Sequence, residues 1–306
     1  MIRLRRLKPG DRVALVAPAS SFPPEEVPAG VAELRRLGLD AVWLEGIFDK
    51  TVFEAGSIET RVKGIVDAWR DPDIAALIAI RGGYGSAQLL PFLDPDVMVA
   101  ARKALVGYSD ITSLLTLYGQ HGLTAIHGPM IDRRLSKGPA AYDMDSFLRV
   151  LMQTDPAGEL RPPQLETLRA GSATGVLAGG TLTQLMASMG TPWAFAPPAA
   201  CVLFLEDIGE RPYRIHRMLT QAAQAGLFAR AVAIVFGEFP GCDEPGGSPA
   251  IRDVLREFTA AFGGPVLFNF PSGHTTGPTW TLPFGVRAEV VGGPSPMVRV
   301  IEAAVE

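Results

Sequence analysis

Residues 74–80 read Ile-Ala-Ala-Leu-Ile-Ala-Ile, and residues 81–85, which follow directly, read Arg-Gly-Gly-Tyr-Gly. Seven apolar residues without polar alternation are typical of a strand that is covered on both faces of a parallel sheet. Apolar runs and amphipathic stretches alternate on both sides of this segment, in the order 12–17, 28–39, 41–44, 57–69, 74–80, 104–106, 111–118 and 124–126. Such strand–helix alternation predicts a doubly wound parallel sheet with right-handed crossovers.

The length and a change of pattern after residue 155 predict two domains. At roughly 150 residues per domain, 306 residues correspond to about two. Residues 1–155 are expected to form an N-terminal α/β domain of the flavodoxin-like kind. Turn formers without periodicity fill residues 156–172, which suits a linker. Residues 173–306 are expected to form a smaller, β-rich α/β domain that ends in strands over 279–282 and 287–290, joined by a turn at 283–285.

Composition excludes several classes of protein. Charged residues make up 20% of the chain, hydrophobic residues 47%, and the net charge is −4, a balance typical of a folded globular protein. The chain has no stripe of lysine and arginine, which argues against nucleic acid as a partner. The apolar run after the basic N-terminus is too short for a signal peptide, and no stretch approaches the ~20 apolar residues of a membrane-spanning helix. We therefore expect a cytoplasmic protein with no membrane partner.

Two loops at the carboxyl ends of predicted strands are candidates for a site, because ligands of open α/β sheets bind there. In the first, Arg81 to Gly85, three glycines let the backbone approach a ligand and present N–H donors. A tight turn that serves packing alone is the alternative. The loop is neither a dinucleotide fingerprint nor a phosphate-binding loop, so nucleotide binding is poorly supported.

The second loop is Gly107-Tyr108-Ser109-Asp110-Ile111-Thr112, where a predicted strand runs directly into a helix. Such a turn places the Ser109 hydroxyl at the top of the sheet beside a helix N-terminus, which favours developing negative charge. The segment is similar to a nucleophile elbow that lacks its final glycine. The alternative is that Ser109 only caps the helix.

A serine nucleophile needs a base and an acid that orients the base. His274, in a loop rich in glycine and proline, is the favoured base; His127 is expected to pack near the sheet edge, His121 to end a helix, and His216 to lie on a solvated helix face. Glu206 directly follows an apolar strand and is the favoured acid, whereas Asp207 and Glu210 suit the start of the next helix. No paired histidines accompany these acids, and the two cysteines, Cys201 and Cys242, are too few for a four-thiolate site, so no metal is expected.

Together these segments resemble the LD-carboxypeptidase family, the murein tetrapeptide carboxypeptidases, which are serine peptidases. The resemblance spans nearly the whole chain in order. It rests on residues 16–20 (Val-Ala-Pro-Ala-Ser), 81–85, 107–112, 127–129 (His-Gly-Pro), 179–182 (Gly-Gly-Thr-Leu), 203–210, 211–219 and 273–274.

The resemblance implies a catalytic triad of Ser109, Glu206 and His274, in a cleft between the two domains. The N–H of Asp110 and one from the Gly82-Gly83 turn would form the oxyanion hole. The resemblance further implies a homodimer, no cofactor, and hydrolysis of the bond between an L-centre and a terminal D-amino acid in cytoplasmic muropeptides, for peptidoglycan recycling. Tyr84 is a further candidate for substrate binding, and Arg81 is the candidate for the terminal carboxylate, since a guanidinium pairs with carboxylates in a bidentate manner.

Two positions depart from the family pattern: Thr181 stands where Asn is common, and His216 where Asp is common. Two other functions remain open. A branch of the same superfamily contains self-immunity hydrolases of peptide–nucleotide antibiotics, which would use the same triad on another substrate. A non-catalytic binder of peptides or small ligands, with Ser109 as a cap, is the alternative from another class.

Overall fold

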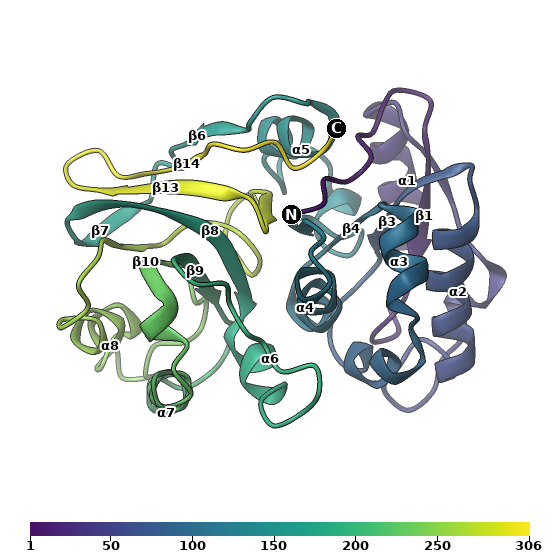
Figure 1. Cartoon of the computed structure of the whole chain (residues 1–306). Helices are drawn as coiled ribbons and strands as arrows, with labels where there is room; N and C mark the ends of the chain where they lie inside the picture. Colours follow the sequence, from purple (N-terminus) through teal and green to yellow (C-terminus); the bar gives the residue numbers. More distant parts are fainter.

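The computed structural model describes residues 1–306, which form two sheets lying side by side with helices around them (Figure 1). The first sheet has the strand order β12-β5-β4-β3-β1-β2, and its strands are parallel except for β12, which runs antiparallel to β5. The bounds are β1 Arg12–Val16, β2 Asp40–Val42, β3 Ile74–Ala79, β4 Ala104–Gly107, β5 Ala125–His127 and β12 Leu282–Phe284. The predicted doubly wound sheet is confirmed.

Helices connect these parallel strands and cover the sheet. All six residues of β3 are buried, as the unbroken apolar run 74–80 predicts for a strand with both faces covered. Helix α2 begins where the Ser57 side chain accepts a hydrogen bond from the Thr60 N–H, the capping predicted from the sequence. The helices of this half are α1 Glu26–Arg36, α2 Ile58–Arg70, α3 Pro95–Ala101, α4 Thr112–Gln120 and α5 Met144–Met152, with 3-10 turns η1 Glu45–Phe48, η2 Ser86–Phe92, η3 Ser109–Ile111 and η4 Leu135–Lys137.

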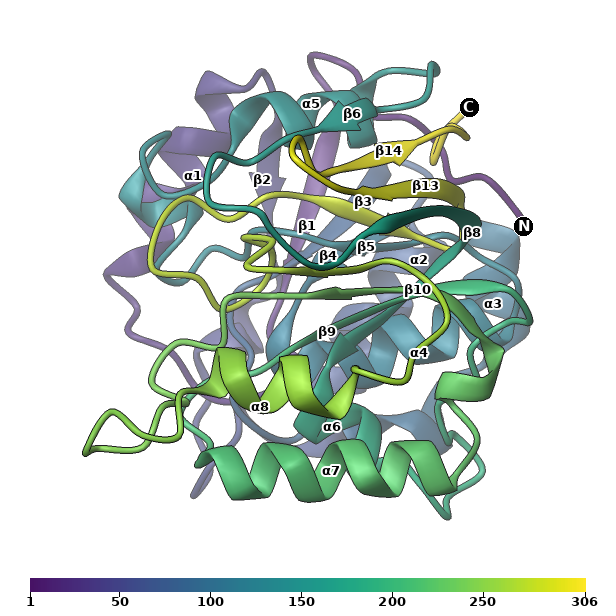
Figure 2. The same cartoon turned by 90° about the vertical axis from the view of Figure 1, so that its left-hand side faces the viewer.

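The second sheet is mixed, in the order β6-β14-β13-β8-β9-β10-β11-β7. Its central strands β8 to β11 are parallel, and antiparallel strands flank them on both sides. Helices α7 and α8 lie together below this sheet (Figure 2). The bounds are β6 Gly158–Leu160, β7 Glu166–Arg169, β8 Gly171–Thr181, β9 Cys201–Glu206, β10 Ala231–Phe236, β11 Val266–Phe268, β13 Arg287–Gly292, β14 Met297–Val300, α6 Leu182–Ala187, α7 Pro212–Gln224, α8 Ile251–Phe258 and η5 Phe228–Arg230.

Two predictions about this half need correction. Residues 156–172, expected as a linker, contain β6 and β7, the two edge strands of the second sheet. Residues 283–284, expected as a turn, belong to β12, which crosses over and pairs with β5 of the first sheet. Local patterning identifies an extended, half-buried segment but not its pairing partner, because β pairing is decided by long-range packing.

One large apolar cluster is shared by the two sheets, and a second cluster of 20 buried residues lies on the other face of the second sheet. Leu282 and Phe284 of β12 belong to the same buried cluster of 66 residues as the strands of the N-terminal half. The chain ends also meet across this junction, where Leu4 and Val305 form an isolated parallel bridge. The division into domains 1–155 and 173–306 stays a prediction.

None of the helices has the length and the apolar composition that a helix needs to cross a bilayer.

Candidate active site

Ser109 lies on a sharp turn between β4 and helix α4. Its φ angle is +63°, a left-handed conformation that is uncommon for a residue other than glycine and that is often found at functional sites. Gly107 allows the chain to turn back so closely, because a Cβ there would lie 2.8 Å from Ile111. The Ser109 side chain makes no capping hydrogen bond to η3 or α4. The geometry is therefore that of a half-buried, uncapped hydroxyl on a strained elbow and not that of a helix cap.

The glycine turn after β3 packs directly on this elbow. A Cβ added to Gly82 would lie 2.8 Å from the Cβ of Ser109 and 3.3 Å from the backbone nitrogen of Asp110. Ser86, which follows the glycine turn, connects it to the elbow of Ser109, because the Ser86 N–H donates to Asp110 Oδ2 at 2.8 Å. The N–H of Tyr84 is already used, since it donates to Ser20 Oγ at 3.0 Å. The space beside Ser109 and Asp110 is therefore kept open by the absence of a side chain at position 82.

Glu206 ends strand β9 of the second sheet and holds His274. The Nδ1 atom of His274 lies 2.8 Å from Glu206 Oε2, and the backbone N–H of His274 donates to the same oxygen at 3.0 Å. Gly273 makes this approach possible, since its φ is +84° and a Cβ there would meet the Glu206 carboxyl carbon at 2.7 Å. One carboxylate oxygen thus fixes both the ring and the backbone of the histidine.

The negative charge of Glu206 and the protonated ring of His274 stabilise each other. Complete burial favours a higher pKa for Glu206, but the contacts with His274 outweigh it, and the pKa of the carboxyl is lowered. Burial favours a lower pKa for His274, yet Glu206 raises it above the ordinary value of 6.5. His274 is only 15% exposed at its side chain, whereas Glu206 is fully buried. The acid therefore stays ionised and stabilises the protonated ring.

Thr181 and His127 contact the other oxygen of Glu206, and the sequence did not identify them as partners of the acid. The Thr181 hydroxyl donates to Oε1, and His127 Nε2 lies 4.0 Å from the same atom. The His127 Nδ1 bonds at 2.9 Å to Ser272 Oγ, whose own proton is given to the Trp280 carbonyl, so Nδ1 carries the hydrogen. Burial lowers the pKa of His127 to about 4, which leaves its ring neutral.

The two halves of the site meet through Tyr108, the residue before Ser109. Its ring lies edge-on to the His274 ring, with 5.1 Å between centroids. The Thr181 N–H also donates to Thr112 Oγ1 at 3.3 Å, which ties strand β8 to the start of helix α4. No hydrogen bond joins Ser109 to His274 in this structure.

Family models match most of the chain. Residues 13–128 match Peptidase S66, described as the LD-carboxypeptidase N-terminal domain, and residues 174–290 match the LD-carboxypeptidase C-terminal domain. The chain belongs to the LD-carboxypeptidase family. The predicted resemblance is thus confirmed, and the carboxypeptidases of this family are serine peptidases.

Several members of the family are similar to this chain along most of its length. Murein tetrapeptide carboxypeptidase of Pseudomonas aeruginosa is 33% identical over 288 residues, which cover 92% of this chain and 93% of that protein. The microcin C7 self-immunity protein MccF of Escherichia coli is 28% identical, covering 90% of this chain and 88% of that protein. The solved structure of muramoyltetrapeptide carboxypeptidase from Oxalobacter formigenes has a TM-score of 0.84 at 27% identity, covering 96% of this chain and 100% of that chain.

The remaining candidate residues lie around the site or away from it. Arg81, 33% exposed at its side chain, forms an ion pair with Asp132, with 3.3 Å between Nε and Oδ2, and its Nη1 donates to the Ser21 carbonyl at 3.2 Å. Tyr84 is exposed and packs edge-on against Phe53. His121 follows helix α4 and is exposed, and His216 is exposed on α7 beside Phe258. Asp207 accepts hydrogen bonds from the N–H and the hydroxyl of Thr183 at the start of α6. Glu210 forms an ion pair with Arg214.

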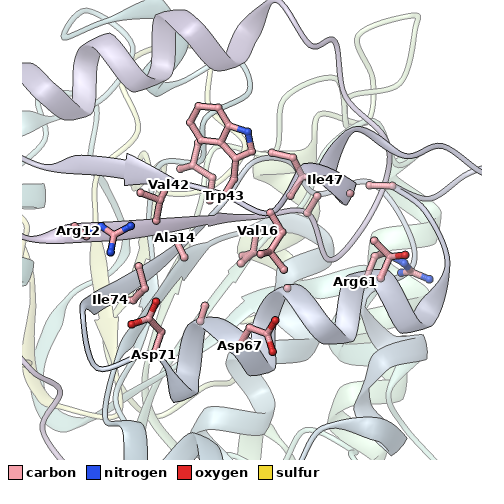
Figure 3. A pocket seen from close by; sticks show the side chains of 18 residues that line it. Arg12, Ala14, Val16, Val42, Trp43, Ile47, Arg61, Asp67, Asp71 and Ile74 are labelled. Atoms are coloured by element: carbon pink, nitrogen blue, oxygen red, sulfur yellow. The ribbon is translucent and has the colours of Figure 1, made fainter.

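A cavity of about 310 Å³ lies elsewhere in the molecule, between helix α2 and strands β1 and β2 (Figure 3). Trp43 and Ile47 line it on one side, and Asp67 of α2 and Asp71, the residue after α2, line it on the other. None of the predicted site residues lines this cavity. Arg61 lines the cavity and also contacts the glycine turn, since its Nη1 donates to the Gly85 carbonyl at 2.9 Å.

Replacing Gly82 by alanine is expected to lower kcat by about 10²-fold, because a shift of about 1 Å in a reacting group can cost that much in rate. The added methyl would lie 2.8 Å from the Cβ and 3.0 Å from the Oγ of Ser109, so the serine side chain would have to shift. Gly82 does not have a positive φ, so alanine adds no backbone strain at this position, and a melting curve checks that the protein folds. The measurement is steady-state release of a terminal D-amino acid, with Gly119→Ala as the control, because a Cβ at 119 meets nothing within 4 Å. An unchanged kcat for Gly82→Ala would contradict this role of the turn.

Proposed function

We propose that this protein hydrolyses the bond between an L-centre and a terminal D-amino acid, such as D-alanine, in muropeptides, with Ser109, His274 and Glu206 as its catalytic triad. The single observation that carries the proposal is the position of Ser109, an uncapped hydroxyl on a left-handed elbow, pressed against Gly82. The pairing of His274 with a buried carboxylate at 2.8 Å supports it. Relatives named murein tetrapeptide carboxypeptidase and muramoyltetrapeptide carboxypeptidase support the substrate class.

In the proposed reaction, Ser109 Oγ attacks the carbonyl carbon of the scissile bond and transfers its proton to His274 Nε2. The Nδ1–H of His274 donates to Glu206, which holds the ring in the required tautomer and stabilises the imidazolium. The ring then gives the proton to the leaving amine of the D-amino acid. Water, activated by the same ring, hydrolyses the acyl-enzyme and regenerates Ser109.

The tetrahedral intermediate carries its negative charge on the former carbonyl oxygen. We assign the oxyanion hole to the N–H of Asp110 and to one N–H of the Gly82-Gly83 turn. The closeness of position 82 to Asp110 N, 3.3 Å from an ideal Cβ, supports this assignment. Each such donor contributes roughly 2.7–4 kcal/mol to transition-state stabilisation. A backbone N–H of the turn is therefore expected to contribute as much to the rate as a side-chain donor would.

The experiment that tests the proposed substrate is a panel of three compounds: a muropeptide tetrapeptide ending in D-alanine, the same peptide ending in L-alanine, and an aminoacyl-sulfamoyl adenylate. We expect release from the first only. Cleavage of the third alone would favour the self-immunity function, which the similarity to the microcin C7 self-immunity protein makes the second candidate. Cleavage of none, with no covalent labelling of Ser109 by a serine-directed probe, would favour a binding protein.

Replacing Arg81 by alanine is expected to raise KM for the tetrapeptide by roughly tenfold or more, because a charge-assisted hydrogen bond to the terminal carboxylate would be lost. The value of kcat should change little. Arg133→Ala is the matched control, since Arg133 faces the same Asp132 carboxylate at 4.0 Å and its side chain is 77% exposed. An unchanged KM for Arg81→Ala would show that another group binds the carboxylate.

The role in peptidoglycan recycling in the cytoplasm and the assembly into a homodimer also remain proposals. Sedimentation of the purified protein tests the dimer. Accumulation of tetrapeptide in cells that lack the gene tests the recycling role.

A further inference from the structure

Arg134 ties the loop that carries His274 to the N-terminal half of the chain. Arg134 lies between β5 and η4, far from residues 273–277 in sequence. Its Nη2 donates to the carbonyls of Gly273, at 3.4 Å, and Thr275, at 3.0 Å, and its Nη1 donates to the Gly277 carbonyl at 3.0 Å. One guanidinium therefore contacts three carbonyls of a single five-residue loop.

The same guanidinium also reaches the loop of the nucleophile. Its Nε lies 3.3 Å from the hydroxyl of Tyr108, which directly precedes Ser109 and packs edge-on against the His274 ring. A further bond joins Nη1 to the Ala141 carbonyl at 3.5 Å. Arg134 forms no ion pair with a carboxylate, so its donors are directed to the backbone and to Tyr108.

We propose that Arg134 is a positioning residue that sets the distance between His274 and Ser109 by binding both loops at once. The proposal rests on the proposed function, in which His274 takes the proton of Ser109. The two residues come from different halves of the chain and share no direct hydrogen bond in this structure. Their alignment therefore depends on groups that bridge the halves, and Arg134 is the residue whose hydrogen bonds reach both loops.

Lysine cannot replace this contact. A guanidinium presents five N–H donors in a rigid planar fork, whereas an ammonium is a point charge with three donors on a flexible stem. Lysine at position 134 would keep the charge and lose the simultaneous contacts. Because a shift of about 1 Å in a catalytic group can cost 10²-fold in rate, loss of the fork should slow the reaction strongly.

The charge of Arg134 has a separate, smaller effect that the pH profile detects. The titratable and charged groups facing His274 are Glu206, Asp207, His127, Tyr108 and Arg134. The positive charge of Arg134 opposes protonation of the ring and so works against the raised pKa of His274. Arg134→Gln should therefore move the acid limb of the pH profile to higher pH, and Arg134→Lys should leave it in place.

The test measures how fast an organofluorophosphonate labels Ser109, followed by mass spectrometry. In that reaction the serine oxygen bonds to phosphorus, fluoride leaves, and His274 takes the proton, so no natural substrate is needed. We expect both Arg134→Lys and Arg134→Gln to slow labelling by about 10- to 100-fold. Arg133→Gln, which removes a charge at the adjacent exposed position, should label at the wild-type rate. Tyr108→Phe, which keeps the ring and removes one bond of the fork, should slow labelling severalfold.

Labelling of both Arg134 variants at the wild-type rate would overturn the proposal. Slow labelling of Arg134→Gln with wild-type labelling of Arg134→Lys would also overturn it, because the charge alone would then be responsible. Melting curves identify a variant that fails to fold. If the Arg134 variants do not fold, slower labelling of Tyr108→Phe would support the proposal, and labelling of Tyr108→Phe at the wild-type rate would overturn it. Labelled wild-type protein that does not cleave the tetrapeptide would refute the substrate and leave this proposal standing. Unlabelled wild-type protein would refute both.

Discussion

Replacing Ser109 by alanine is expected to lower kcat for D-alanine release from a tetrapeptide by a factor on the order of 10⁶, as removal of a serine nucleophile does in other serine peptidases. In the proposed mechanism, the Ser109 hydroxyl is the group that forms the acyl-enzyme. The measurement is single-turnover release of D-alanine at high enzyme concentration, which detects the small residual rate.

The fold should survive this change. The Ser109 hydroxyl caps neither η3 nor α4, so its removal breaks no helix cap. We expect the melting temperature to stay within a few degrees of wild type. Ser295→Ala, an exposed position in the β13–β14 turn, is the matched control and should keep full activity. Release by Ser109→Ala at more than a small percentage of the wild-type rate would remove Ser109 from the mechanism.

Replacing Glu206 by glutamine is expected to lower kcat by about 10⁴-fold, the effect seen when the acid of a serine triad becomes an amide. Glutamine keeps the volume of the buried side chain but removes the charge that stabilises the imidazolium. It also weakens the hold on the tautomer, since Oε2 accepts from both the ring and the backbone N–H of His274.

The pH profile of this variant has a definite sign. The base must be neutral, so activity falls as the pH drops through the pKa of His274, which Glu206 raises above 6.5. Without that carboxylate the pKa falls, and the acid limb of kcat/KM moves to lower pH. Glu210→Gln is the control, because Glu210 forms a partly exposed pair with Arg214 at 3.4 Å and such pairs contribute little. An acid limb that stays in place would show that Glu206 does not tune His274.

Local sequence was sufficient for much of the first sheet and for the elbow. The apolar run at 74–80 predicted a strand buried on both faces, and β3 has every residue buried. The strand-to-helix junction at 107–112 predicted a sharp turn at Ser109, and its left-handed φ is observed. Both features have a local signature in the sequence, an unbroken apolar run in the first case and a strand-to-helix junction in the second, and patterning records such signatures well.

The surroundings of the acid could not be predicted in this way. Thr181 was noticed only as a departure from a family pattern, and His127 only as a histidine at a strand end. Both face Glu206 because β5 and β8, from different sheets, end beside β9. No local periodicity records such a meeting, since it depends on how two sheets pack.

The sequence by itself therefore determined which segments are extended or helical, which turn carries the serine, and to which family the chain belongs. Only the tertiary structure decided that β12 leaves its neighbours to pair with β5, that the supposed linker supplies two edge strands, and that Arg134 contacts three carbonyls of the His274 loop. The physical reason is one of range. Helix and strand patterns arise from neighbours a few residues apart, whereas strand partners and backbone contacts between loops are selected by burial across the whole molecule.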